Sequence, residues 1–188
     1  MKGDYIFRDG KLYFKEKAVF SVKAEDSGIG VSKYYLIDSE GTESEISDIS
    51  KFTINDGKSS IVVEDELGNK SNPVKVKDLY KLESDIFVVD SEIPEVSIEK
   101  DKAVIDNWYK DDVDFVAKAV DNEGIYSLVA KVNGKDVASY EFKDGSKILK
   151  EKELNASTKG IDSQKGNVYS LSVEVEDMSG NNCLLYTS

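Results

Sequence analysis

The sequence contains no histidine among its 188 residues. Serine–histidine and cysteine–histidine catalysis and imidazole-ligated zinc are therefore excluded within this chain. The single cysteine, Cys183, cannot form an internal disulfide or a thiolate cage for a metal. Pairs of carboxylates are still able to hydrolyse glycosides. An enzyme is thus disfavoured rather than excluded, and we expect none.

Long apolar runs are also missing from the chain. No stretch is long enough to span a bilayer, and no export signal follows Met1. If the parent protein is extracellular or at the cell surface, as we expect, this chain is therefore an interior piece of it. Proline occurs only twice and glycine thirteen times, which argues against a low-complexity linker.

Positive charge is scarce relative to negative charge. Twenty-five basic residues stand against thirty-seven acidic ones, so the net charge is −12. A surface of this sign repels phosphate backbones and anionic lipids. We expect no nucleic-acid partner and no membrane insertion. The charge suits an extracellular module, or one that holds cations.

The last six residues, 183–188, match one reading frame of a transposase end sequence that is widely used as a sequencing adapter. Because cysteine occurs nowhere else in the chain, we interpret them as an artefact of read-through after Asn182. The alternative is a genuine hydrophobic strand. Under the first interpretation, the second half of the chain lacks its natural last strand.

A short acidic turn occurs four times, and it organises the rest of the sequence. Each copy ends an alternating apolar stretch and places a glycine shortly after an aspartate. The four aspartates are Asp26, Asp65, Asp121 and Asp177. Because the copies come as two pairs, the chain reads as one unit written twice.

The strands that precede these turns also repeat. Residues 15–26 align with residues 110–121, and residues 61–65 align with residues 173–177. In each aligned stretch, apolar residues recur at every second position, which is typical of a half-buried strand. This alternation puts all four aspartates on the inward-pointing side, just beyond the last apolar residue.

Other stretches predict the elements between these strands. Asp9-Gly10 and Asn133-Gly134 predict hairpins. Residues 39–50 are polar and acidic and predict an exposed connection. Residues 73–79 alternate again and predict a closing strand, and residues 147–154 predict a strand with a loop.

Many short alternating strands with turn signals between them predict an all-β fold, specifically two tandem immunoglobulin-like β-sandwiches. We place the first sandwich at residues 1–82 and the second at residues 94–188. A junction at residues 83–93 separates them, and Pro94 enforces an extended entry to the second.

The turns give the chain a resemblance to the bacterial Ig-like domains of cell-surface and secreted proteins. The first pair of matching motifs is Asp26-Ser27-Gly28-Ile29 with Asp65-Glu66-Leu67-Gly68-Asn69, and the second is Asp121-Asn122-Glu123-Gly124-Ile125 with Asp177-Met178-Ser179-Gly180-Asn181. The resemblance implies spacers, stalks and ligand-binding ends in adhesins and wall-bound enzymes, without shared catalytic residues.

The carboxylates of the turns have two interpretations. In the local one, each aspartate accepts N–H groups of its own turn, and the glycine supplies a positive φ. In the other, calcium binds, because it prefers carboxylate and carbonyl oxygens. Asp85 and Glu92 in the junction would then lie near the second pair of turns. The predicted calcium ligands are Asp26, Asp65, Asp90, Asp121 and Asp177; no other cofactor is expected.

Large aromatic side chains precede the second strand of each unit, namely Tyr13 and Phe14, and Trp108 and Tyr109. They either plug the bottom of each sandwich or stack on a sugar, and Tyr34 and Tyr35 pose the same question. We expect a non-catalytic spacer or interaction module whose partners are neighbouring domains of its parent protein. The alternatives are an adhesin module that binds cell-wall glycan or a host protein, and an accessory domain of an extracellular glycoside hydrolase.

Overall fold

The computed structural model describes residues 2–3, 5–100, 109, 112–163 and 168–187. The fold is all-β with several antiparallel sheets, as the sequence predicts. Contacts between Cα atoms divide the chain into two compact units, unit 1 (Met1–Asp90) and unit 2 (Ser91–Ser188). The division falls within the predicted junction, and residues 83–90 pack with unit 1. That the two units fold independently stays a prediction.

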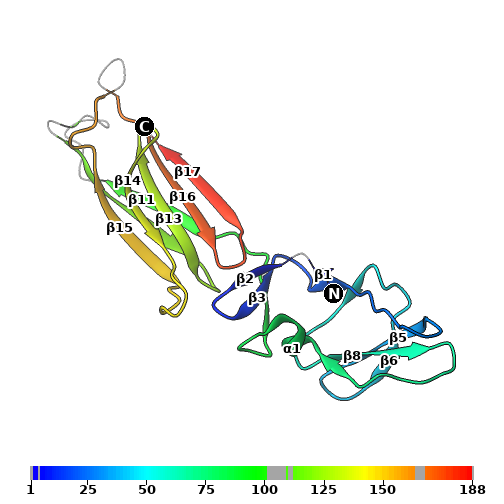
Figure 1. Cartoon of the computed structure of the whole chain (residues 1–188). Coiled ribbons are helices and arrows are strands. Elements are labelled where there is room, and N and C mark those ends of the chain that lie inside the picture. The colour runs from blue at the N-terminus through cyan, green and yellow to red at the C-terminus, as the bar shows by residue number, and fades with distance from the viewer. Residues whose placement is uncertain (1, 4, 101–108, 110–111, 164–167, 188) are drawn as a thin grey trace. The chain divides into compact units, whose positions relative to one another are not determined.

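Unit 2 contains two sheets that form a sandwich (Figure 1). The three-stranded sheet has the order β11-β12-β15, and the four-stranded sheet has the order β14-β13-β16-β17. The strands are β11 (Glu95–Lys100), β12 (Asp114–Val120), β13 (Ile125–Val132), β14 (Lys135–Glu141), β15 (Glu151–Ser157), β16 (Leu171–Asp177) and β17 (Asn182–Thr187). All neighbouring pairs are antiparallel.

The core of unit 2 lies between these sheets because their inward positions are apolar. Phe115, Ala117 and Ala119 alternate along β12 and are buried, while the residues between them are more exposed. On the facing sheet, Val173 and Val175 of β16 belong to the same cluster. Side chains from both sheets therefore share one apolar layer, which defines a sandwich.

Unit 1 repeats this strand order with shorter strands. Its three-stranded sheet is β1-β4-β7 and its four-stranded sheet is β6-β5-β8-β9. The strands are β1 (Lys2–Gly3), β4 (Val19–Ser21), β5 (Val31–Ile37), β6 (Glu43–Glu45), β7 (Phe52–Thr53), β8 (Ser60–Asp65) and β9 (Val74–Lys75). Its apolar cluster, which includes Phe14, Phe20 and Ile61, is separate from that of unit 2.

A third sheet, β10-β3-β2, is an addition in unit 1. Its strands are β2 (Ile6–Arg8), β3 (Lys11–Phe14) and β10 (Phe87–Val89). The hairpin of β2 and β3 turns at Asp9 and Gly10, with φ of 48° and 70°. The β13–β14 hairpin turns in the same way at Asn133 and Gly134, with φ of 51° and 78°. Both predicted hairpins are confirmed, since two successive positive φ angles match the twist of the flanking strands.

The predicted closing strand over residues 73–79 is confirmed only at Val74–Lys75, where β9 pairs with β8, and is wrong beyond them. Helix α1 (Val76–Tyr80) follows β9. Val76 is buried and Tyr80, four residues later, packs on the same core, whereas Leu79 is 48% exposed. A spacing of four places both residues on one helical face, and this spacing competes with the alternation that the sequence suggests.

Two further segments differ from or extend the predictions. The acidic connection at residues 39–50 contains the short strand β6, which pairs with β5 at the edge of its sheet. The last residues, Asn182–Thr187, form β17 and pair with β16 along their length. They supply the last strand of unit 2, while the proposed adapter origin of residues 183–188 stays a prediction.

Candidate functional site

The turn after β16 is held by the carboxylate of Asp177. Its Oδ1 accepts the Asn181 N–H at 2.8 Å, and its Oδ2 accepts the Asn181 Nδ2–H at 2.8 Å. The backbone closes the same turn, because the Asp177 N–H donates to the Asn181 carbonyl at 3.1 Å. Asp177 is completely buried and Asn181 is 9% exposed. A buried carboxylate without such donors would be costly.

The turn after β8 in unit 1 has the same construction around Asp65. Its carboxylate accepts the N–H of Asn69 at 2.8 Å and the Nδ2–H of Asn69 at 2.8 Å. A third donor is the N–H of Leu67, also at 2.8 Å. These bonds, that from the Asn69 side chain first, lower the pKa of the Asp65 carboxyl below its ordinary value, because they favour the charged form.

The turns between the second and third strands of each sandwich also use their aspartates locally. Asp121 Oδ1 accepts the N–H groups of Glu123 at 2.9 Å and Gly124 at 2.7 Å. In unit 1, Asp26 Oδ2 accepts two N–H groups of its own turn, each at 3.0 Å. The hydrogen bonds that the local interpretation predicts are therefore present in all four acidic turns.

In each unit, the two acidic turns meet through one backbone hydrogen bond. The Met178 N–H donates to the Gly124 carbonyl at 2.9 Å, and the Glu66 N–H donates to the Gly30 carbonyl at 3.3 Å. These glycines have φ of +124° and +99°, which favour glycine. In both units, the strand register also shifts two residues after the glycine.

This equivalence corrects the motif alignment made from sequence. Gly30, rather than Gly28, occupies the position of Gly124. Of the two glycines in this turn, Gly30 has a positive φ and Gly28 does not. The turn of unit 1 is thus one residue longer than that of unit 2. The sequence motifs align Ile29 with Ile125, but the two side chains differ in burial. Ile29 lies within the longer turn and is 50% exposed, whereas Ile125 begins β13 and is fully buried.

The prediction that all four aspartates point inward is wrong for Asp26, which is exposed. In unit 2, a neighbouring loop covers the first turn, because the carbonyls of Lys150 and Leu149 accept the N–H groups of Asp121 and Ile125, both at 2.8 Å. In unit 1, the corresponding loop bonds earlier, to the Val22 N–H. The Asp26 turn therefore lies beyond the reach of that loop.

The structure brings two of the predicted calcium ligands together. Carboxylate oxygens of Asp121 and Asp177 lie within 4.8 Å of each other in unit 2, and both side chains are buried. In unit 1, the turns of Asp26 and Asp65 adjoin through their backbones. Asp90, the last residue of unit 1, is 3% exposed and donates its N–H to the Phe14 carbonyl at 2.8 Å. Its place in a calcium site stays a prediction.

The acids predicted for the junction have separate surroundings. Asp85 forms an ion pair with Lys77 at 3.2 Å, and its carbonyl accepts the Gly57 N–H at 2.7 Å. Both contacts lie within unit 1. Glu92, two residues into unit 2, is exposed.

The buried pair in unit 2 is suited to holding structure. Carboxylate chemistry on a glycoside requires that an acid and a base both reach the substrate. Asp121 is 5% exposed and Asp177 is 0% exposed. Each also accepts hydrogen bonds from its own turn. The arrangement therefore favours a fixed loop over general acid–base catalysis.

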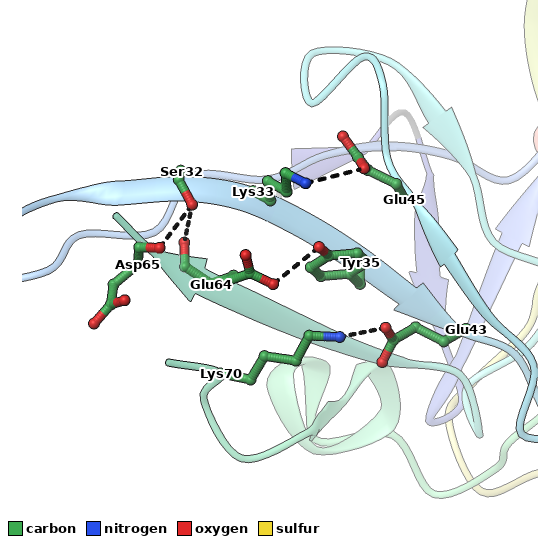
Figure 2. Close-up of polar contacts among 8 residues, drawn as sticks. All are labelled: Ser32, Lys33, Tyr35, Glu43, Glu45, Glu64, Asp65 and Lys70. Carbon is green, nitrogen blue, oxygen red and sulfur yellow. Dashed lines mark hydrogen bonds and ion pairs between the residues drawn. The ribbon is translucent and has the colours of Figure 1, made fainter. Parts of the chain in front are cut away.

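A second polar cluster lies on the outer face of the four-stranded sheet of unit 1, and the sequence did not reveal it. Figure 2 shows side chains of β5, β6 and β8 reaching toward one another across this face. The Tyr35 hydroxyl donates to Glu64 Oε2 at 2.9 Å. Lys70 forms an ion pair with Glu43, and Lys33 lies 3.9 Å from Glu45. A usable signal was the alternation of Glu43 and Glu45, which places both on one face of a strand.

This cluster determines the environment of Tyr35. The hydrogen bond to Glu64, followed by burial and by the negative charge of that carboxylate, raises the pKa of the Tyr35 hydroxyl to about 12. The Lys70 ammonium lies 4.0 Å from the centre of the Tyr35 ring, a cation–π distance. Because this lysine covers the ring, Tyr35 offers no open face on that side for a sugar.

The remaining aromatic predictions have different outcomes. Tyr34 packs on the core of unit 1 while Tyr35 lies on the outer face, as alternation requires. Tyr13 and Phe14 are 2% and 1% exposed, and Phe14 packs in the core of unit 1 as the structural interpretation predicts. Tyr109 is half-buried, and Trp108 lies outside the described residues.

No model of a known protein family matches this sequence, and no curated protein matches it. Within the described residues, α1 has five residues, and no helix there has the length and apolarity that a bilayer crossing requires.

Proposed function

We propose that this chain is a non-catalytic tandem of Ig-like modules that serves as a spacer in a bacterial surface or secreted protein. The observation that carries the proposal is the direction of the outer strands in unit 2. β11 begins opposite Val120 and β17 begins opposite Glu176, which both lie at the acidic-turn end. β17 ends opposite Leu171, at the other end of the sandwich. Any last strand that pairs antiparallel with β16 has this direction, whatever the origin of residues 183–188.

An entry and an exit at opposite ends are what a spacer requires. Unit 2 then adds the length of its strands to the distance between the parts of the chain that precede and follow it. β17 has six residues, so its strand spans roughly 20 Å at about 3.4 Å per residue. A module whose entry and exit lay at the same end would add far less.

The acidic turns support this function by making their end of each sandwich rigid. Their carboxylates accept N–H groups within each turn, and a backbone bond joins the two turns of each unit. Satisfied polar groups of this kind fix one conformation. The parallel construction in both units favours a repeated structural role, and the partners are then the domains on either side.

A display assay tests the proposal. The chain is placed between a wall anchor and a reporter domain on a bacterial surface, and binding of an antibody to the reporter is measured. Deletion of the chain should reduce antibody binding. Replacement by an unrelated pair of sandwiches of equal length should restore it, because a spacer acts through length.

The opposite result separates the alternatives. One result would favour a binding domain instead of a spacer. In it, the unrelated sandwiches do not restore antibody binding to the reporter, and this chain by itself binds a glycan array or a host protein. The matched control is the same replacement with a flexible glycine–serine linker, which should restore less binding because its mean span grows only as the square root of its length.

A further inference from the structure

The third sheet of unit 1 ties the start of this unit to its end. We propose that the parallel pair of β3 and β10 is a mechanical clasp, which encloses residues 15–86 and resists tension applied along the chain. The proposal rests on the spacer function, because a spacer on a cell surface transmits the force that acts on whatever it displays.

Residues 83–90 do not form a free linker after the sandwich. The Glu83 N–H donates to the Gly10 carbonyl at 3.1 Å, where the turn of the β2–β3 hairpin lies. β10 then pairs with β3 in parallel register. The Asp90 N–H continues this ladder by donating to the Phe14 carbonyl at 2.8 Å. The segment is therefore attached to the hairpin at its start, along β10 and at its end.

Core packing reinforces the pair. Leu12 and Phe14 of β3 and Phe87 of β10 are 0%, 1% and 8% exposed. The ring centres of Phe14 and Phe87 lie 5.6 Å apart, and Phe87 also lies 5.8 Å from Phe20. Separation of the two strands thus requires the removal of Phe87 from the apolar core together with the loss of the ladder.

The direction of the strands determines how tension acts on them. β1 and β2 have two and three residues, and a pull on the N-terminal side peels them from their neighbours one pair at a time. The pull then reaches β3 at Lys11, whereas β10 is pulled from Asp90. Because these strands are parallel, they are loaded at opposite ends, and all their pairings must break together.

Single-molecule force extension of the full chain, held by tags at both ends, tests the clasp. The clasp encloses roughly 70 residues between β3 and β10, which extend by about 240 Å at ~3.4 Å per residue. We expect one step of this size in the wild-type chain. Release of the same residues in several smaller steps would overturn the proposal, and this result needs no variant.

Two neighbouring valines provide matched variants. N–H groups alternate sides along a strand, and the Asp90 N–H faces β3. The Val88 N–H therefore faces β3 and the Val89 N–H faces away. Val88→Pro should lower the force of the 240 Å step at least twofold, whereas Val89→Pro should change it little. Equal effects of the two variants, or no effect of either, would contradict the clasp.

The spacer function and the clasp fail in different experiments. If the display assay shows that the chain is not replaceable by length while the 240 Å step is present, the spacer function is wrong and the clasp stands. If the display assay succeeds while unit 1 extends without that step, the clasp alone is wrong.

Discussion

The side chain of Asn181 closes the turn that starts at Asp177, and its backbone N–H binds the same carboxylate. Asp65 and Asn69 repeat this relationship in unit 1. The two copies differ mainly in exposure, because the pair in unit 2 is buried while Asn69 is exposed. The chain thus contains the same aspartate–asparagine turn twice, once buried and once exposed to solvent.

Replacement of the asparagine should therefore cost more in unit 2. Asn181→Ala removes the Asn181 side-chain donor from a buried carboxylate, and we expect a loss of about 2–3 kcal/mol in the free energy of unfolding. Asn69→Ala should cost less than ~1 kcal/mol, because water replaces the donor. Urea denaturation of each variant checks the difference, and equal losses would contradict it.

The pKa of Asp65 predicts the direction of an acid effect. Its pKa is lowered in the folded chain, so its contribution to stability is present above the ordinary value of about 3.9 and is lost as the pH falls below it. Asn69→Ala should move the Asp65 pKa back toward its ordinary value. A carboxyl titration by NMR measures this shift, with Ser71→Ala as a control elsewhere on the same loop.

The two equivalent glycines should respond differently to alanine. At Gly124, a Cβ atom would lie 2.3 Å from Ile148 Cγ2, and φ is +124°. At Gly30, φ is +99° but nothing lies within 4 Å of the added atom. We expect Gly30→Ala to cost about 1–2 kcal/mol from backbone strain alone, and Gly124→Ala to cost roughly 1–3 kcal/mol more from overpacking. Thermal unfolding of both variants measures the two losses of stability. A larger loss for Gly30→Ala than for Gly124→Ala would contradict the prediction.

Tyr35 should make unit 1 sensitive to alkali. Its pKa is raised to about 12, above the ordinary value of about 10. The folded chain therefore holds the proton more tightly, so this contribution is complete below pH 10 and is lost as the pH rises toward 12. Ultraviolet titration of phenolate should show one fewer late-titrating tyrosine in Tyr35→Phe than in the wild-type chain. Tyr80, whose pKa burial also raises to about 12, should still titrate late in that variant.

Calcium is the remaining prediction from the sequence. If the close carboxylates of Asp121 and Asp177 share a cation, millimolar calcium should raise the thermal midpoint, and a chelator should reverse the change. Magnesium at the same concentration is the control, because it prefers stricter octahedral geometry and retains its waters. An unchanged midpoint at millimolar calcium would remove the prediction.

The sequence by itself determined the long alternating strands, the two hairpins and the repeat. Alternation with a period of two fixes which side chains of β12 and β16 face inward, and that pattern is local. The hairpins at Asp9-Gly10 and Asn133-Gly134 follow from the positive φ that these residues tolerate. The role of the acidic turns was also accessible, because an aspartate binds N–H groups only a few residues away.

Tertiary structure decided everything that depends on contacts between distant residues. The partner of β10 is β3, more than seventy residues earlier, and no local pattern names it. The exposure of Asp26 and the burial of Asp121 depend on where a separate loop bonds. The helix at Val76–Tyr80 replaced a strand because two of its residues meet the core at a spacing of four. Local alternation states which side of a strand is apolar, but only packing states what lies against it.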